Sequence, residues 1–452
     1  MFPREEIFFE YIPLALVDET VVNTHQRNTP LAYNGDMPSR RRFLGTSAAS
    51  SLLMSQPQFL RAQSGQKLKA GLIGFGGRGR QAVVDMLTGD ANAEIHYIAD
   101  LFEDKLESNL TWLRDANRHP RIQSQIKVTP ETRWSGFEAY KKVIASDCDI
   151  VMLATPPGYR PMHFEAAINA KKHVFCEKPF GTDPVGVRRF MDAAKKSEQL
   201  KLTVVTGAQR RFQKEYVETV DKVKSGAIGD VRSLYAYWVG TPVIQQPKGR
   251  DPKWGDMTWQ HRNWYSFVWI CGDQIVEQHL HNIDVCNWVM GGPPARVVAT
   301  GGSVWRPKDE VHGNIYDHIS SDFEYPNGVR LSSYCRQFKS GLYTNVSELI
   351  VGAKGKTNGR DLGTPAAINP YVAEHVALVK SIRGEGPYIN HAMAVAESTM
   401  TCIMARESAY SGKEITWDMI MNSQQDLQPK AFDYDTKMIV PPLPVPGEYQ
   451  FR

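Results

Sequence analysis

One run of acidic and imidazole side chains, in the second half of the chain, holds the groups best suited to proton transfer. It reads Asp273-Gln-Ile-Val-Glu277-Gln-His279-Leu-His281-Asn-Ile-Asp284. On a helix its three acids and His281, separated by four, four and three positions, would share one face, whereas His279 would lie on the other side. A carboxylate four residues before a histidine can orient and polarise it as a general base, so we predict catalytic roles for Glu277 and His281.

The same helix face admits two other uses. Asp273 and Asp284 are candidates for hydrogen bonds to substrate hydroxyls. Glu277, His281 and Asp284 also have a spacing at which they could ligate zinc or manganese. A lysine that we expect at the same site, Lys178, would repel a divalent cation, so we favour proton transfer and expect no metal.

Five of the ten tryptophans lie between Trp254 and Trp288, in a segment that holds candidate substrate-binding residues. Aromatic faces stack on the C–H faces of a polyhydroxylated ring, and neighbouring polar side chains bind its hydroxyls. The candidates are Arg262, Asn263, Trp264 and Tyr265, together with Arg210 from an earlier basic pair. The alternative interpretation of the tryptophans is packing in the core or at a domain interface, and the sequence leaves both open.

A glycine-rich turn near residue 74 has the spacing of a dinucleotide site. An apolar strand that begins at Lys69 runs into Gly74, Gly76 and Gly79, and a helical pattern follows through Leu87. In a GxGxxG turn the first glycine permits the tight turn, the second lets the backbone approach a pyrophosphate, and the third lets the helix pack closely on the strand. The N-terminus of the helix then supplies N–H donors to the phosphates.

The predicted second strand, residues 93–100, ends in an acid that bears on cofactor choice. Asp100 follows Gly79 by 21 residues, where a carboxylate binds ribose hydroxyls and repels a 2′-phosphate. This position predicts NAD as the cofactor. Arg78 or Arg80 could soften that preference, which leaves NADP as the alternative.

Helical and strand patterns alternate through residue 176, which predicts a doubly wound parallel sheet. Such sheets deliver ligand-binding residues to the carboxyl ends of their strands. Two of these ends carry polar groups, Thr155-Pro156-Pro157 and Glu177-Lys178-Pro179. We expect Lys178 to lie near the reactive ring of a bound dinucleotide, where it could shuttle a proton.

Three motifs together resemble the Gfo/Idh/MocA family of oxidoreductases, and in particular its glucose–fructose oxidoreductase-like members. They are Gly74–Gly79, Thr155-Pro-Pro-x-x-Arg-x-x-His163 and His173-Val-Phe-Cys-Glu-Lys-Pro179, and the match in order and spacing extends over residues 67–420. The resemblance implies a Rossmann NAD(P)-binding domain followed by an α/β domain with an open sheet. That sheet would cover the nicotinamide and mediate assembly into a homodimer or homotetramer.

The resemblance also implies roles for individual residues. Glu177 would contact the nicotinamide ribose and Lys178 would face the substrate hydroxyl. Thr155, Pro156 and His163 would line the cofactor groove. The chain departs from the family pattern at Glu277, where an aspartate is usual, and the longer side chain puts the proton-transfer geometry in doubt.

Length and composition predict a globular protein of two domains, and the alternation of helix and strand patterns predicts the α/β class. The 452 residues are 42% hydrophobic and 23% charged, and the net charge of +4 gives no reason to expect nucleic acid as a partner. No apolar run is long enough to span a membrane, and the six scattered cysteines do not suggest a disulfide framework. We expect a Rossmann domain over residues 67–195, a substrate and oligomerisation domain with a largely antiparallel sheet over 196–425, and a proline-rich arm over 426–452.

The first 62 residues do not resemble a fold. Residues 37–62 contain Ser39-Arg-Arg-Arg-Phe-Leu44 followed by small and mildly apolar residues, without an acid before Lys69. This pattern predicts a twin-arginine signal and a periplasmic or other extracytoplasmic location. Residues 1–36 are then an extension or a misassigned start.

These features predict an oxidoreductase that transfers hydride between NAD(P) and a secondary hydroxyl of a sugar, glycoside or cyclitol. Because little free NAD exists outside the cytoplasm, such an enzyme would hold its cofactor tightly and recycle it within each cycle. Two alternatives remain: an NAD-dependent glycosidase or epimerase that oxidises its substrate transiently, and a non-catalytic protein that holds the cofactor and binds sugar.

Overall fold

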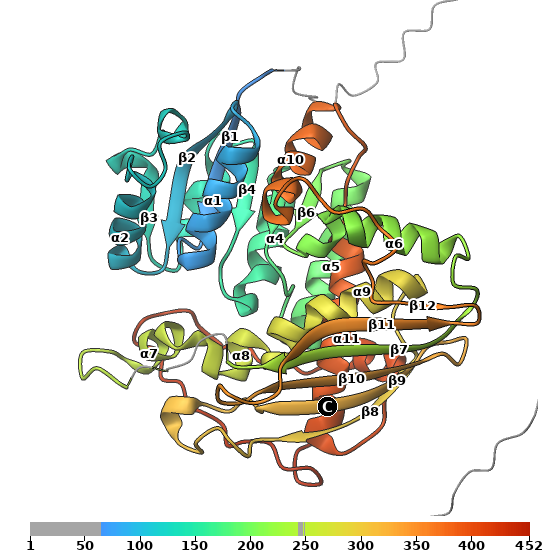
Figure 1. The fold of residues 1–452 in the computed structure, drawn as a ribbon. Coiled ribbons are helices and arrows are strands. Elements are labelled where there is room, and N and C mark those ends of the chain that lie inside the picture. The colour runs from blue at the N-terminus through green and yellow to red at the C-terminus, as the bar shows by residue number, and fades with distance from the viewer. Residues whose placement is uncertain (1–64, 243–246, 248) are drawn as a thin grey trace, which may run out of the picture. The chain divides into compact units, whose positions relative to one another are not determined.

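The computed structural model describes residues 65–242, 247 and 249–452, all of which belong to the unit Phe59–Arg452. The predicted N-terminal extension and twin-arginine signal, residues 1–36 and 37–62, lie outside the described residues. The described part of the chain folds around two sheets (Figure 1). The sequence predicts both kinds of sheet, one parallel and one largely antiparallel.

The first sheet is parallel throughout and has the strand order β3-β2-β1-β4-β5-β6. Its strands are β1 (Leu68–Ile73), β2 (Ala93–Asp100), β3 (Arg133–Ser135), β4 (Ile150–Leu153), β5 (His173–Cys176) and β6 (Val204–Thr206). Every residue of β4 and β6 is buried, as expected where helices cover both faces of a parallel sheet. The strand order reverses between β1 and β4, and such a switch point opens a crevice at the carboxyl ends of the strands.

Helices between the strands cover this sheet. They are α1 (Gly77–Gly89), α2 (Glu103–Leu113), α3 (Ala139–Ala145), α4 (Arg160–Asn169) and α5 (Pro184–Gln199). The first four coincide with helical patterns in the sequence except at their ends, whereas α5 lies beyond the predicted alternation. Helices α1, α2 and α5 carry apolar residues on the face they bury. The Rossmann prediction for this part of the chain is therefore confirmed.

The first sheet extends further along the chain than predicted. The boundary predicted at residue 195 precedes β6, which is the last strand of this sheet. Helix α10 (Pro370–Arg383) also returns to it from the second half of the chain, where it packs against α1 and its Arg383 pairs with Asp90 at 2.6 Å.

The second sheet has seven strands in the order β12-β11-β7-β10-β9-β8-β13. Their bounds are β7 (Val231–Gly240), β8 (Arg296–Gly302), β9 (His318–Glu324), β10 (Arg330–Gln337), β11 (Asn345–Gly352), β12 (Lys356–Thr357) and β13 (Ile415–Thr416). The segment Tyr325-Pro-Asn-Gly328 forms the hairpin turn that joins β9 to β10. The sheet is mixed, because β7 and β10 pair in parallel. Strand β11 was not expected from the sequence.

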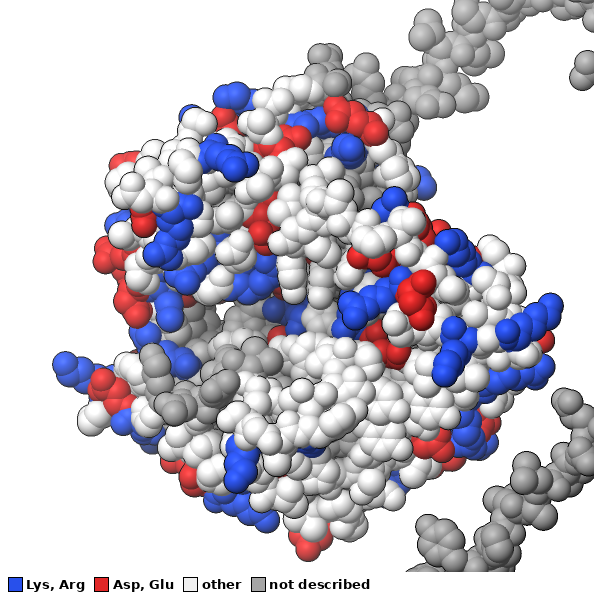
Figure 2. Space-filling view, in the orientation of Figure 1, with Lys and Arg blue, Asp and Glu red and all other residues white. Residues whose placement is uncertain are grey.

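Helices cover one face of the second sheet and leave the other open. The covering helices are α9 (Leu280–Met290) and α11 (Ala392–Ser411), while α6 (Lys214–Lys224) packs on α9. On the open face, which is turned toward the viewer in Figure 1, the rings of Tyr237 and Tyr334 stack with centroids 5.7 Å apart. Figure 2 shows that the surface over the middle of this sheet carries few charged side chains.

The C-terminal arm lies on the body of the chain. Phe432, Met438 and Val440 pack beside an aromatic cluster that includes Trp259, which lies in the short helix α7 (Asp256–Arg262). The hydroxyl of Tyr434 donates a hydrogen bond of 2.6 Å to the carbonyl oxygen of Leu101, just after β2. The arm thus ties the second half of the chain to the first sheet.

Within the described residues, no helix is both long enough and apolar enough to cross a membrane.

Candidate cofactor and substrate site

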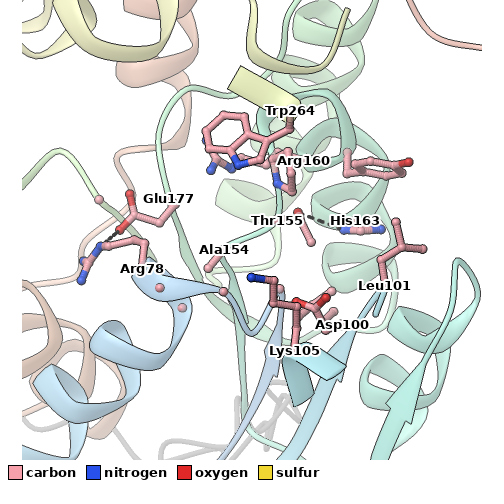
Figure 3. Close-up of a pocket in the computed structure, with 18 of the residues that line it drawn as sticks. Arg78, Asp100, Leu101, Lys105, Ala154, Thr155, Arg160, His163, Glu177 and Trp264 are labelled. Atoms are coloured by element: carbon pink, nitrogen blue, oxygen red, sulfur yellow. Dashed lines mark hydrogen bonds and ion pairs between the residues drawn. The ribbon is translucent and has the colours of Figure 1, made fainter. Parts of the chain in front are cut away.

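A pocket of about 790 Å³ lies along the carboxyl edge of the first sheet. Its walls come from the glycine turn, from the ends of β2, β4 and β5, and from residues 261–281 of the second half of the chain. Figure 3 shows residues of this pocket, with Asp100 and Lys105 on one side and Glu177 beside Arg78 on another. The predicted cofactor residues and the predicted catalytic residues therefore share one pocket.

The glycine turn has the shape that a pyrophosphate needs. Gly74 has a φ of +95°, and a Cβ on it would lie 2.5 Å from the backbone nitrogen of Thr155. A Cβ on Gly79 would lie 2.0 Å from the carbonyl oxygen of Gly74. A Cβ on Gly76 or Gly77 would meet nothing within 4 Å, so the backbone at the start of α1 is open to a phosphate.

Asp100 lies where the sequence predicts a ribose contact. Its carboxylate accepts hydrogen bonds from the backbone N–H groups of Phe75, at 2.7 Å, and Phe102, at 3.0 Å. Burial raises the pKa of Asp100, although these two donors oppose that shift. The side chain is thus held at the end of β2 and lines the pocket.

Arg78 does not weaken the preference for NAD over NADP that Asp100 sets, because its guanidinium is bound to three carboxylates. Nε donates to Glu177 at 2.5 Å, Nη1 to Asp85 at 3.0 Å and Nη2 to Glu374 at 2.9 Å. The side chain still lines the pocket, where it fixes the carboxylate of Glu177. Burial, followed by the charge of Glu177, raises the pKa of Glu374 well above its usual range.

The residues after β4 line the groove as the resemblance implies. Thr155 and Pro156 both face the pocket, and Thr155 Oγ1 lies 3.3 Å from Nδ1 of His163. Burial lowers the pKa of His163 to about 3, so the imidazole is neutral at physiological pH. A neutral ring at this place contributes shape and hydrogen bonding rather than charge.

Lys178, Glu277 and His281 all line the pocket, but Glu277 binds the lysine and not the histidine. Lys178 Nζ donates to the backbone carbonyl of Glu277 and lies 3.3 Å from its Oε1. The other carboxylate oxygen accepts from the side-chain amide of Gln278. The predicted pairing of Glu277 with His281 is therefore wrong, and Glu277 positions Lys178.

A wide turn of the helix explains this correction. Residues Ile275–His279 form a π-helical turn that precedes α9, and not the α-helix that the spacing argument assumed. In a π-turn each residue bonds to the fifth along, so positions 277 and 281 no longer stack on one face. Asp273 lies before this turn with a φ of +79° and does not share the face either.

His281 is a neutral, partly accessible base. Burial lowers its pKa well below 6.5, and the charges of Lys178, Arg210 and Arg78 lower it further. Nδ1 is buried without a hydrogen-bond partner, whereas the ring packs against Trp238 with centroids 5.9 Å apart. His279, as predicted, faces away: it is fully buried, and its Nε2 lies 2.8 Å from the hydroxyl of Ser333.

Four of the predicted substrate-binding residues lie outside the pocket. Asp273 accepts hydrogen bonds from the backbone of Tyr316 and the hydroxyl of Tyr410, and Asp284 forms two bonds of 2.8 Å with Arg211. Arg210 pairs with Glu348, and Asn263 Nδ2 donates to the carbonyl of Trp259. All four are buried, and these contacts give them structural roles. Because Asp284 is committed to Arg211, the carboxylates considered as metal ligands do not converge.

Trp264, Tyr265 and Arg262 do line the pocket, although Arg262 lies at its adenosine end. The guanidinium of Arg262 lies 4.0 Å from the ring centroid of Phe102 and pairs with Asp104 at 2.8 Å, both just after β2. Tyr265 is fixed by Gln337, whose amide donates to its hydroxyl at 2.9 Å. Arg262 therefore bridges the two halves of the chain and is far better placed for the cofactor than for a sugar.

Several lining residues were missed by the sequence analysis: Tyr159, Arg160, His261, Gln278 and Tyr371. Arg160 stands inside the quoted motif after Thr155, so its position was a usable signal. Tyr371 belongs to α10, which packs against α1 from the second half of the chain.

Family models match both halves of the chain. Residues 68–206 match the model described as an oxidoreductase family with an NAD-binding Rossmann fold, and residues 216–357 match the GFO/IDH/MocA C-terminal domain. The first match ends with β6, in agreement with the extent of the first sheet.

Curated relatives are distant and match over part of their length. The uncharacterized oxidoreductase YrbE of Bacillus subtilis is 24% identical over 231 residues, which is 51% of this chain and 60% of the relative. The myo-inositol 2-dehydrogenase of Thermotoga maritima is 22% identical over 234 residues, 52% of this chain and 58% of the relative. The chain thus spans little more than half the length of these two proteins.

Solved structures share the fold over most of the described chain. The aldose-aldose oxidoreductase from Caulobacter crescentus superposes with a TM-score of 0.59 at 17% identity, covering 78% of this chain and all of that one. The scyllo-inositol dehydrogenase from Lactobacillus casei, solved with NAD(H) and scyllo-inositol, gives 0.58 at 19% identity, over 78% and 99% of the two chains. With the two model matches, these likenesses show that the chain belongs to the GFO/IDH/MocA family of NAD-binding oxidoreductases.

Proposed function

We propose that this protein oxidises or reduces a secondary hydroxyl of a sugar, glycoside or cyclitol with an NAD that it holds tightly and recycles. The observation that carries this proposal is the single pocket in which the glycine turn, Lys178, Glu277 and His281 meet. The inositol dehydrogenases and the aldose-aldose oxidoreductase to which the chain is similar support a polyhydroxylated substrate.

Bound NAD would supply a nicotinamide carbon that accepts hydride from the carbinol carbon. The residues of this chain would manage the proton that leaves the hydroxyl oxygen. His281 suits that task, because its lowered pKa keeps the ring neutral and able to accept a proton at physiological pH. Lys178, held by Glu277, would donate a hydrogen bond to the same oxygen and orient the substrate.

Contacts at the adenosine end support retention of the cofactor. Arg262 pairs with Asp104, and Tyr434 of the C-terminal arm donates to the carbonyl of Leu101. Both contacts join the second half of the chain to the loop after β2, beside the wall of the pocket. A dinucleotide bound there would leave only after these contacts open.

Location and assembly belong to the same proposal. The arginine-rich segment of residues 37–62 supports export by the twin-arginine route, which carries folded proteins and so suits a preloaded cofactor. The open, weakly charged face of the second sheet supports a homodimer or homotetramer.

Release of bound nucleotide tests the proposal. The protein purified without added cofactor is denatured, and the supernatant is analysed for NAD(H) by mass spectrometry. We expect close to one dinucleotide per chain, and a 340 nm absorbance change when a sugar is added to the intact protein. Nucleotide-free protein that turns over rapidly on added NAD would contradict tight retention. Products with net hydrolysis or epimerisation would indicate transient oxidation instead of net oxidation.

A further inference from the structure

Arg160 is a buried cation of the pocket that has no anionic partner. The side chain lies at the start of α4, is 5% exposed and lines the pocket. Among the described residues no carboxylate lies within ion-pair distance of it, and its one hydrogen bond runs from Nη1 to the carbonyl oxygen of Pro179 at 2.8 Å. Nε is buried without a partner, which leaves Nη2 as the nitrogen that reaches the pocket.

The other basic residues of this pocket differ from Arg160. Arg78, Lys178 and Arg262 each pair with a carboxylate, and Lys105 is exposed to solvent. Burial disfavours the charged form of Arg160, and the charges of Glu177 and Glu277 offset this only from beyond ion-pair distance, so a ligand carboxylate would give it a close partner. Arg160 is therefore the buried basic residue of this pocket that an anionic ligand would pair with.

The position of Arg160 separates this anion from the phosphates of the cofactor. Its bond to Pro179 places it beside Lys178, at the end of the pocket where hydride transfer would occur. The phosphates of a dinucleotide belong at Gly76 and Gly77, at the start of α1. The nicotinamide end carries a positive charge when oxidised, so an unpaired arginine there is not balanced by the cofactor.

We propose that Arg160 binds a carboxylate of the substrate, so that the protein acts on a sugar acid, a uronate or an aldonate, in preference to a neutral sugar. This inference rests on the proposed function and names its substrate class. One guanidinium without an ion-pair partner matches one carboxylate, and a charge-assisted hydrogen bond from Nη2 would hold it. Arg160 and Trp264 both line the pocket (Figure 3), so a cation and an aromatic face are both available to a sugar acid bound there.

A pair of matched sugars tests the proposal. Methyl glucoside and methyl glucuronide share the ring hydroxyls and differ in whether carbon 6 is an alcohol or a carboxylate. Binding of each to NAD-loaded protein is measured by calorimetry, and hydride transfer by absorbance at 340 nm. We expect the acid to bind about ten to one hundred times more tightly, since a hydrogen bond to a charged group is worth about 1.5–3 kcal/mol. Equal binding of the two sugars, or tighter binding of a glucose phosphate, would overturn the proposal.

Two variants locate the effect at Arg160. Arg160→Gln removes the charge but keeps a donor for the carbonyl of Pro179, and it should bring the ratio of acid to neutral binding close to one. Arg160→Lys keeps the charge and should restore most of the preference. A loss of NAD affinity as large as the loss for the acid would show that Arg160 serves the cofactor. If neither sugar gives an absorbance change or an altered product, the proposed function fails for these two substrates, whereas the calorimetric preference still decides the role of Arg160.

Discussion

Buried histidines should make this protein labile to mild acid. In each of five histidines the pKa is lowered from 6.5 to about 3 or 4. Burial is the main cause, and nearby charges contribute less at some of them. They are His163, His173, His261, His279 and His391. Because the unfolded chain binds a proton at each of them below pH 6.5 and the folded chain does not, stability is present above pH 6.5 and is lost as the pH falls toward 4.

The size of this effect follows from the shifts. A histidine whose pKa falls from 6.5 to about 4 loses about 2 kcal/mol of stability between pH 8 and pH 5, so five of them lose about 10 kcal/mol. Asp273 opposes this change, because burial raises its pKa to about 6 and it gains about 1 kcal/mol over the same interval. The loss from the five histidines alone is comparable with the whole stability of an ordinary protein, about 5–15 kcal/mol. The raised pKa values of Glu374 and Asp100 oppose it in the same sense as that of Asp273.

Urea unfolding followed by tryptophan fluorescence at pH 8, 6 and 5 measures this loss. We expect the urea midpoint to fall steeply below pH 6.5. His173→Gln is the matched variant, because its amide oxygen can still accept the hydrogen bond that Thr203 N–H donates to His173 Nδ1 at 3.0 Å. It should reduce the loss at pH 5 by about 2 kcal/mol. A midpoint that stays constant or rises between pH 8 and pH 5 would refute the reasoning.

Three further substitutions probe how the cofactor is held. Gly207→Ala places a Cβ 2.3 Å from Oε2 of Glu177, so it should displace that carboxylate and weaken NAD binding about tenfold or more in a fluorescence titration; unchanged affinity would show that Glu177 does not contact the cofactor. Arg262→Met removes the pair with Asp104, which is largely exposed, and should speed NAD release about two- to fivefold in a stopped-flow chase. Tyr434→Phe removes one hydrogen bond and should speed NAD release by a similar factor, about fivefold. If both variants release NAD at the parental rate, neither the C-terminal arm nor α7 helps to retain the cofactor.

The cofactor half of the site could be predicted because its signals are local. The positions of Gly74, Gly79 and Asp100 follow from a strand, a turn and a helix that are contiguous in the chain. The contribution of the turns after β4 and β5 to the site was equally predictable, since the carboxyl ends of strands in a parallel sheet meet at one edge.

The substrate half was harder, because its geometry depends on partners that are distant in sequence. Arg211 meets Asp284 across 73 positions and Arg210 meets Glu348 across 138, and no periodicity in a helix announces such pairs. The π-turn at 275–279 had no sequence signal either. Because of this turn, the side chain of Glu277 contacts Lys178 and not His281. Residue type predicted that Lys178, Glu277 and His281 would share one site, but the pairing of these residues required the fold.

The most direct test of the central claim uses Lys178→Ala and His281→Ala in protein loaded with one NAD per chain. A sugar substrate labelled with deuterium at the reacting carbon is added, and transfer of the label to the nicotinamide is followed by mass spectrometry. We predict that both variants keep their NAD and lose label transfer by at least a hundredfold relative to the parent, since a positioned proton-transfer group contributes about that much. Label transfer at the parental rate in both variants, with NAD still bound, would contradict the account.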